Sequence, residues 1–179
     1  DIFELIDQQF ARLSILERQI MYWLAINREW VSLKELQNEI IDFRTRDLMA
    51  ALESLQSRCL IENQAGLFTQ QPVVMEYIIE ELIEQVTQEI YTKEIHILNK
   101  YALIKAQTQD YLRNAQIQFI LKPITAQLSN FWETNQTIQN HLNQLLLQLK
   151  SSTPPKPGYA AGNIINLLRQ LDIQLNNYD

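Results

Sequence analysis

The fold is decided by residues 12–66, RLSILERQIMYWLAINREWVSLKELQNEIIDFRTRDLMAALESLQSRCLIENQAG. Apolar residues recur at the spacing of one helix face in three stretches of it, at 13–26, 33–41 and 47–60. Two short runs of strand-like composition, 60–62 and 67–69, flank the turn residues Gln64, Ala65 and Gly66. This order of three helices and a hairpin predicts a winged helix-turn-helix. Such a module either binds DNA or is a structural block inside a larger regulated protein.

Local signals for helix starts agree with this order. Ser14 with Glu17, and Ser32 with Glu35, form the S-x-x-E pattern of a capping box, in which each side chain bonds a free backbone N–H. Thr45 is the expected N-cap of the third helix. We therefore expect three separate short helices in this stretch.

Composition favours a mainly α protein. Of 179 residues, 46% are hydrophobic and only 3 are Gly and 5 Pro, so helices run long without interruption. The net charge of −6 argues against a general affinity for nucleic acid, because phosphate binding needs clustered Lys and Arg. One cysteine rules out an intrachain disulfide. No membrane-length apolar run and no basic leader is visible, so we expect a cytoplasmic location.

The second part of the chain is expected to be a helical bundle. Pro72 suits the first position of a helix, with Gln71 as its cap. Pro123 should kink or split a later helix near residues 121–122. A final helix is expected to be capped by Asn163. Helical patterns cover residues 73–97, 98–112, 115–128 and 131–150.

Three domains follow from these patterns. Residues 1–71 form a winged-helix domain with a lead-in helix, and residues 72–150 form the helical bundle. Residues 151–179 form a proline-rich linker, centred on 151–158, and a C-terminal helix. The lead-in helix has no start signal before it, so we expect the chain to begin inside a larger protein.

The search for chemistry gives a negative expectation. The chain has no G-x-x-x-x-G-K-[ST] motif to hold a triphosphate. His96 and His141 stand alone, without Cys or His at metal-ligand spacing. Cys59 falls on the apolar face of the third helix and is expected to be a packed thiol. We therefore predict no catalytic residues, no metal site, no cofactor in this chain and no enzymatic activity.

DNA binding is the alternative that the fold raises. The predicted outward positions of the third helix are Arg46, Asp47, Ala50, Glu53, Ser54 and Ser57. Asp47 and Glu53 would face phosphates, which weakens binding, and the hairpin loop carries no Lys or Arg. A DNA-binding transcription regulator with a helical effector or dimerisation domain is thus the second hypothesis.

The chain also resembles a known family. RLSILERQIMYWLAI, residues 12–26, is similar to the start of the winged-helix domain in cyanobacterial STAND-type NTPases. These are relatives of the NB-ARC or AP-ATPase family and typically carry a C-terminal WD-repeat propeller. The similarity continues at LESL (52–55), QPVVMEY (71–77) and PGYAAGN (157–163), and covers nearly the whole chain.

The resemblance implies a place within a signalling ATPase. The partners would be a preceding nucleotide-binding domain and following repeats of the same parent chain. The segment would pack on that domain and relay its state to the repeats, without catalysing a reaction. In the family a Met-His-Asp motif follows the wing, and its His approaches the β-phosphate of ADP. By position the motif falls on Gln70, Gln71 and Pro72, so Gln71 is the nucleotide-proximal candidate, although a helix cap explains it equally well.

The join between the two halves is expected to couple them. No flexible spacer separates the hairpin from the long helix that follows. Phe68 and Val74 are expected to pack on the winged-helix core, and Pro72 to fix the entry angle because its ring fixes φ. We therefore predict interdomain coupling through Phe68, Gln71, Pro72 and Val74.

Overall fold

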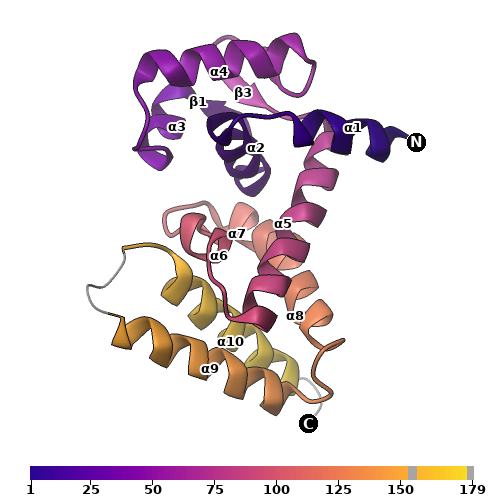
Figure 1. The fold of residues 1–179 in the computed structure, drawn as a ribbon, viewed down its shortest axis with the longest axis vertical. Helices are drawn as coiled ribbons and strands as arrows, with labels where there is room; N and C mark the ends of the chain where they lie inside the picture. The colour runs from indigo at the N-terminus through magenta and orange to yellow at the C-terminus, as the bar shows by residue number, and fades with distance from the viewer. Residues whose placement is uncertain (153–156, 177–179) are drawn as a thin grey trace. The chain divides into compact units, whose positions relative to one another are not determined.

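The computed structural model describes residues 1–152 and 157–176, with side chains up to residue 172. The chain divides into an N-terminal unit, Asp1–Glu80, and a C-terminal unit, Glu81–Asp179. Helices dominate both units, and one small antiparallel sheet lies in the first (Figure 1). The predicted mainly α fold with a short hairpin is therefore confirmed. The predicted domain boundaries after residues 71 and 150 stay predictions.

The N-terminal unit has the element order expected from the sequence, with one addition. Its elements are α1 (Ile2–Ala11), α2 (Ile15–Asn27), β1 (Val31–Ser32), α3 (Leu33–Glu39), α4 (Thr45–Ser57), β2 (Glu62–Gln64), β3 (Leu67–Thr69) and the start of α5 (Pro72–Thr92). Strand β1 was not predicted, because two residues are too short to show an alternating pattern. The core of the N-terminal unit consists of apolar side chains of α2, α3 and α4, including Ile20, Leu36 and Leu55, each fully buried.

The sheet joins the hairpin to the segment between α2 and α3. The strand order is β1-β3-β2, with Val31 opposite Phe68 and Asn63 opposite Phe68 on the other side. The turn between β2 and β3 places Ala65 at φ 51° and Gly66 at φ 79°. Glycine reaches this region without steric cost, so Gly66 acts at the turn as predicted.

Both predicted capping boxes are present, but two other expectations for this unit are wrong. The side chains of Ser14 and Ser32 accept bonds from the N–H groups of Glu17 and Glu35. Helix α4 is preceded by Arg44 without a side-chain cap, while the Thr45 hydroxyl accepts a bond from Gln37 at 2.8 Å. Cys59 is exposed, not packed, because α4 ends at Ser57 and Cys59 has a positive φ of 58°.

All regular elements in the described part of the C-terminal unit are helices. Its elements are the rest of α5, then α6 (Ile97–Lys100), α7 (Asp110–Gln116), the π-helical segment η1 (Ile117–Leu121), α8 (Lys122–Leu128), α9 (Asn135–Ser151) and α10 (Ala160–Asn176). Helix α10 packs on α9, α6, α8 and η1 (Figure 1). Its buried side chains Ile164, Leu167 and Leu171 therefore form the centre of this unit.

Pro123 changes its helix where the sequence predicted. The backbone is π-helical from Ile117 to Leu121 and returns to α-helix at Lys122. Proline lacks an N–H and its ring clashes with the carbonyl four residues earlier, so the turn before it must widen or bend. The helix type changes at residues 121–122, the position where a kink or a split was predicted, but the helical backbone continues there without a break.

Two other predictions for this unit are wrong for one shared reason. Of the helix expected at 98–112, only α6 and the first residues of α7 are helical, and Asn163 lies inside α10 instead of capping it. The Asn163 side chain accepts from Leu103 N at 3.0 Å and donates to the carbonyls of Leu98 and Tyr101, both at 2.7 Å. These bonds occupy backbone groups that a continuous helix would need.

The cap of α10 comes instead from Asn99. Its side-chain oxygen accepts from Ala160 N at 3.2 Å, and its backbone carbonyl accepts from Tyr159 N at 2.9 Å. The predicted linker at 151–158 lies partly outside the described residues. No helix in the described part is long and apolar enough to cross a membrane.

Gly158→Ala is expected to destabilise the C-terminal unit. A Cβ at Gly158 would overlap the side-chain amide of Asn99. Asn99 must then rotate away and lose its bond to Ala160, which costs about 1 kcal/mol, the usual value of an N-cap. Chemical unfolding followed by circular dichroism measures this difference. Gly162→Ala is the control, because a Cβ there meets nothing within 4 Å, and an equal loss in both variants would contradict the cap.

Candidate functional site: the β3–α5 junction and the exposed face of α4

The predicted coupling residues lie at the junction between β3 and α5. Phe68 on β3 and Val74 on α5 are buried, as predicted for core packing. Pro72 is the first residue of α5, where a missing N–H costs nothing. Gln71 is exposed, and its backbone carbonyl accepts the N–H of Met75 at 2.9 Å. Whether these four residues transmit motion stays a prediction.

Gln70 ties this junction to α2, and the sequence did not reveal it. Its side chain is 3% exposed and its Nε2 donates to the backbone carbonyl of Met21 at 2.8 Å. The Oε1 atom is buried and has no hydrogen-bond partner among the described residues. The bond to a carbonyl 49 residues away fixes the chain just before α5 begins.

Tyr77 ties the first turns of α5 to α1. Its hydroxyl donates to the Asp7 carboxylate at 2.7 Å, and its ring meets Phe10 edge-on at 6.0 Å. Phe10 in turn meets Tyr22 of α2 edge-on at 5.7 Å. Such edge-to-face pairs add stability beyond their buried area. The lead-in helix is thus fastened to both α2 and α5 within the N-terminal unit.

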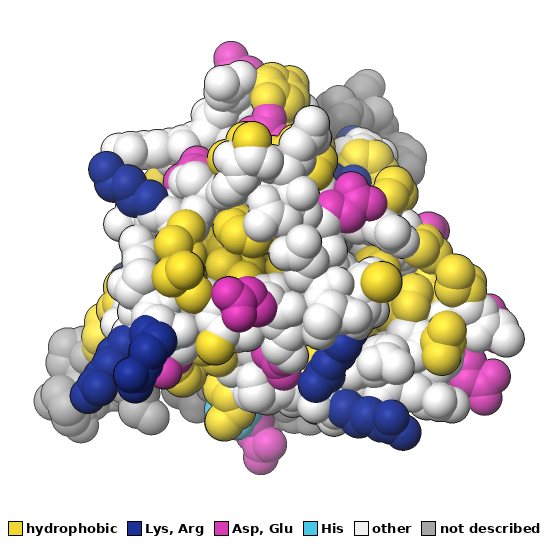
Figure 2. Space-filling view, turned by 90° about the horizontal axis from the view of Figure 1, so that it is seen from above, with side chains coloured by type: hydrophobic (Ala, Val, Ile, Leu, Met, Phe, Trp, Pro, Cys, Tyr) yellow, Lys and Arg dark blue, Asp and Glu magenta, His cyan; other side chains and the backbone are white. Residues whose placement is uncertain are grey.

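The exposed face around the start of α4 is apolar and mixed in charge. Ile41 and Phe43 in the turn before α4, and Met49 on the helix, are 80%, 37% and 47% exposed. Arg44 and Arg46 are exposed beside Asp47, and the hairpin strand β2 presents Glu62 with uncharged amides. Figure 2 shows one face of the molecule, on which Lys and Arg side chains stand in separate groups divided by uncharged and acidic ones. Exposed apolar side chains like those before and on α4 are typical of protein contacts, and Arg44 and Arg46 beside Asp47 do not form the purely basic cluster that phosphate binding needs.

Ser54, predicted to face outward, is half-buried and bound to Glu17. Its hydroxyl donates to Glu17 Oε1 at 2.6 Å, while Oε2 accepts from Ser14 N at 2.7 Å. Burial alone would raise the pKa of Glu17, but bonds from Ser54 and Ser14 and the charge of Arg58 outweigh it, so the pKa lies below its usual 4.5. Ser54 is therefore a link between α4 and α2 and not a base-reading residue.

Glu17→Gln is expected to destabilise the N-terminal unit in a pH-dependent way. At neutral pH the loss is roughly 1 kcal/mol, because charge-assisted bonds become neutral ones. The folded pKa lies below the unfolded one, so the contribution is complete above pH 4.5 and disappears as pH falls through the folded value. Urea unfolding of both proteins at neutral and acid pH measures the gap. A gap that widens on acidification would contradict this assignment.

No three His, Cys, Asp or Glu side chains in the described ranges are grouped as a metal site requires.

Comparison with known proteins gives one informative match. The chain is 42% identical, over 213 aligned residues, to an uncharacterized WD repeat-containing protein of the cyanobacterium Nostoc sp. strain PCC 7120. The alignment covers the whole chain but only 17% of that relative. No family model and no solved structure matches. The chain is therefore similar to a small part of a WD repeat-containing protein.

Proposed function

We propose that the chain is a non-catalytic regulatory and interaction segment of a STAND-type signalling NTPase. It packs on a nucleotide-binding domain through a winged-helix unit and relays the state of that domain to sensor repeats of the same chain. The main support for the proposal is the similarity to a WD repeat-containing protein, because the alignment covers only 17% of that protein and leaves room for other domains. The sequence resemblance to STAND-type NTPases supplies the identity of the neighbouring domains.

The apolar face around α4 supports this role. Ile41 and Phe43 in the turn before α4, and Met49 on α4, place exposed apolar surface at the helix that would otherwise read DNA. Exposed apolar surface rimmed by charged groups is typical of protein contacts. The occupant that we propose is the nucleotide-binding domain of the parent chain. Gln71, exposed at the start of α5, is the residue proposed to lie near the nucleotide.

The coding sequence that flanks this segment tests the proposal directly. A G-x-x-x-x-G-K-[ST] motif within a few hundred residues upstream, and WD repeats downstream, are expected. The absence of the P-loop motif there would overturn the assignment to a signalling NTPase, whatever the segment itself binds.

A variant of the parent protein tests the proposed contact. Met49→Asp should speed release of bound nucleotide by roughly tenfold, because a charge placed in an apolar contact costs at least 1.4 kcal/mol by the usual conversion. Leu5→Asp is the matched control, since Leu5 is 57% exposed on α1, outside that face. Equal rates of nucleotide release in the two variants would show that α4 is not part of the proposed interface.

The alternative, a winged-helix transcription regulator, predicts a different result with DNA. We expect affinity for duplex DNA weaker than about 10 µM at physiological salt, within the non-specific range. The reason is the uncharged hairpin and the acidic residues beside Arg44 and Arg46. Fluorescence anisotropy with random and genomic duplexes measures this affinity. Submicromolar binding to a defined sequence would favour the regulator instead.

A further inference from the structure

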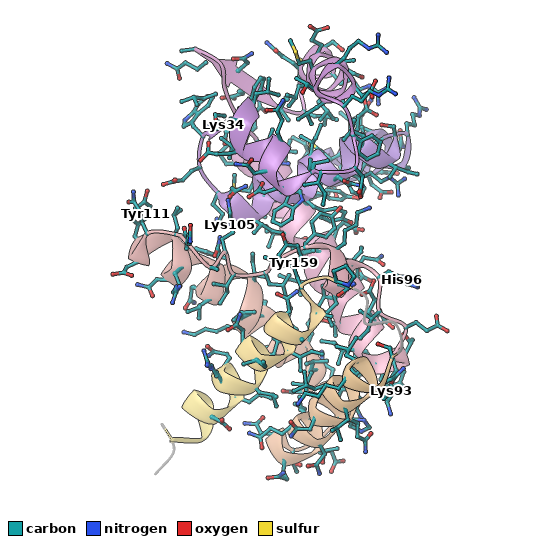
Figure 3. All side chains as sticks on the ribbon, turned by 90° about the vertical axis from the view of Figure 1, so that its left-hand side faces the viewer. Lys34, Lys93, His96, Lys105, Tyr111 and Tyr159 are labelled. Atoms are coloured by element: carbon teal, nitrogen blue, oxygen red, sulfur yellow. The ribbon has the colours of Figure 1, made fainter. Side chains whose placement is uncertain are left out.

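The C-terminal unit contains a hollow that the proposed function does not use. Its walls are the segment 102–106, one side of α7 and η1, and the first three turns of α10. Its volume is about 560 Å³, within the range of small-molecule sites. Tyr159, which directly precedes α10 and is labelled in Figure 3, is one of its lining residues. All lining residues belong to the C-terminal unit, so the hollow is defined within that unit.

The charge of the hollow is opposite to that of the chain. Its charged lining residues among those described are Arg113 and Arg169, with no Asp or Glu, although the chain carries a net charge of −6. The Arg113 guanidinium also donates to the backbone carbonyl of Ala106 at 3.3 Å, which holds it beside the hollow. Arginine binds carboxylates and phosphates through paired N–H groups. The two exposed arginines, without a carboxylate among the described lining residues, therefore favour an anion over a cation.

A polar side chain also lines the hollow. Gln170 is only 5% exposed and is one of the lining residues, together with Arg169. A side-chain amide can both donate and accept hydrogen bonds. Gln170 is therefore a further feature, besides the arginines, that suits a polar ligand.

The start of α10 keeps the hollow open. Gly162 lines it, and a Cβ there would meet nothing within 4 Å. Glycine in a helix costs roughly 0.5–1 kcal/mol relative to alanine, and no steric conflict requires it here. The opposite wall is apolar, with Ile104, Ile117 and Leu121.

We propose that this hollow binds a small organic anion, a carboxylate or phosphate monoester carried on an apolar body. Arg113 and Arg169 hold the anionic group, Gln170 bonds a polar atom of the ligand, and Ile104, Ile117 and Leu121 contact the body. This proposal does not depend on the proposed function as part of a signalling NTPase, and either one can fail without the other.

The glycines of the chain provide the test. It has three, of which Gly158 and Gly162 line the hollow and Gly66 lies in the hairpin of the other unit. Isotope labelling of glycine alone gives three amide signals in a nuclear magnetic resonance spectrum. Titration with phenyl phosphate, or separately with phenylacetate, should shift the Gly158 and Gly162 signals saturably and leave Gly66 unchanged. Which of the two probes binds tighter decides between phosphate and carboxylate.

Several outcomes would overturn the proposal. One is no shift with either probe up to about 5 mM, the limit of weak binding. Another is an equal response to neutral phenylacetamide, which would show that the anion is not recognised. A shift of Gly158 without Gly162 would place the probe in a second hollow of about 440 Å³ beside Lys93 and Lys150, which Gly158 lines and Gly162 does not.

Two variants of the whole chain complete the test. Arg169→Gln should weaken probe binding at least tenfold, whereas Arg44→Gln, an equal change of charge on the N-terminal unit, should not. Gly162→Leu should abolish binding by filling the hollow while leaving the thermal midpoint unchanged or higher, with Gly162→Ala as the smaller control. Full binding by Gly162→Leu would show that the probe lies elsewhere.

Discussion

Glu89→Ala is expected to lower the free energy of unfolding of the C-terminal unit by roughly 2–4 kcal/mol. The Glu89 carboxylate, 8% exposed on α5, accepts three backbone N–H groups, from His96 at 3.0 Å, Ile97 at 2.7 Å and Leu98 at 2.9 Å. These are the free N–H groups at the start of α6. Leu98 is fully buried, so water cannot replace its lost bond. The three donors thus lose a charged acceptor together.

The experiment combines global unfolding with a local readout. Urea unfolding measures the total loss, and amide hydrogen exchange of residues 96–98 reports whether protection is lost there first. Glu84→Ala is the control, because Glu84 lies exposed on the same helix. Glu89→Gln should fall between the two, since it keeps an oxygen acceptor without the charge. If both alanine variants behaved alike, the carboxylate would not be holding α6.

The parts of the fold that were predictable depend on neighbouring residues. Ser14 and Glu17 satisfy each other's backbone groups three residues apart, so a helix start is visible in the sequence itself. Pro72 and Pro123 act through their own missing N–H and fixed φ. Their helix start and change of helix type therefore lie where predicted. Gly66 fixes the hairpin turn in the same local way.

The parts that were not predictable depend on bonds between distant residues. Residues 98–112 have helical composition, but Asn163 holds three of their backbone groups from at least 60 residues away. The expected cap at Thr45 failed because its hydroxyl bonds Gln37 of α3 instead. No periodicity encodes such partners, because the same asparagine is an ordinary cap in another setting.

The residues of the candidate site also fall into those that were predictable from the sequence and those that were not. Phe68 and Val74 were recognisable as buried because they are apolar residues at pattern positions. Gln70 and Tyr77 were not, since only the tertiary structure brings Met21 and Asp7 to them. The absence of cations from the hairpin, read from the sequence, remains the stronger argument against DNA, because it needs no structure.

Asn163→Asp is expected to destabilise the C-terminal unit strongly. Asn163 is 2% exposed, and its Nδ2 donates to the carbonyls of Leu98 and Tyr101 at 2.7 Å each. A carboxylate in its place would point an anion at two carbonyl oxygens. The expected cost is roughly 4–5 kcal/mol at neutral pH, against about 3 kcal/mol for Asn163→Ala, which only leaves the backbone groups unpaired.

The pH dependence separates this electrostatic cause from simple loss of packing. Burial and the two carbonyls would raise the folded pKa of the introduced carboxyl above its unfolded value. The penalty is then complete above the folded pKa and shrinks as pH falls through it, because the protonated group can donate to one carbonyl. The gap between Asn163→Asp and Asn163→Ala should narrow or reverse in acid. Urea unfolding of both across this range, with Asn166→Asp as the control one turn away on the half-exposed side, measures it. A gap independent of pH would show that the charge of the introduced carboxylate is not the cause of the extra loss.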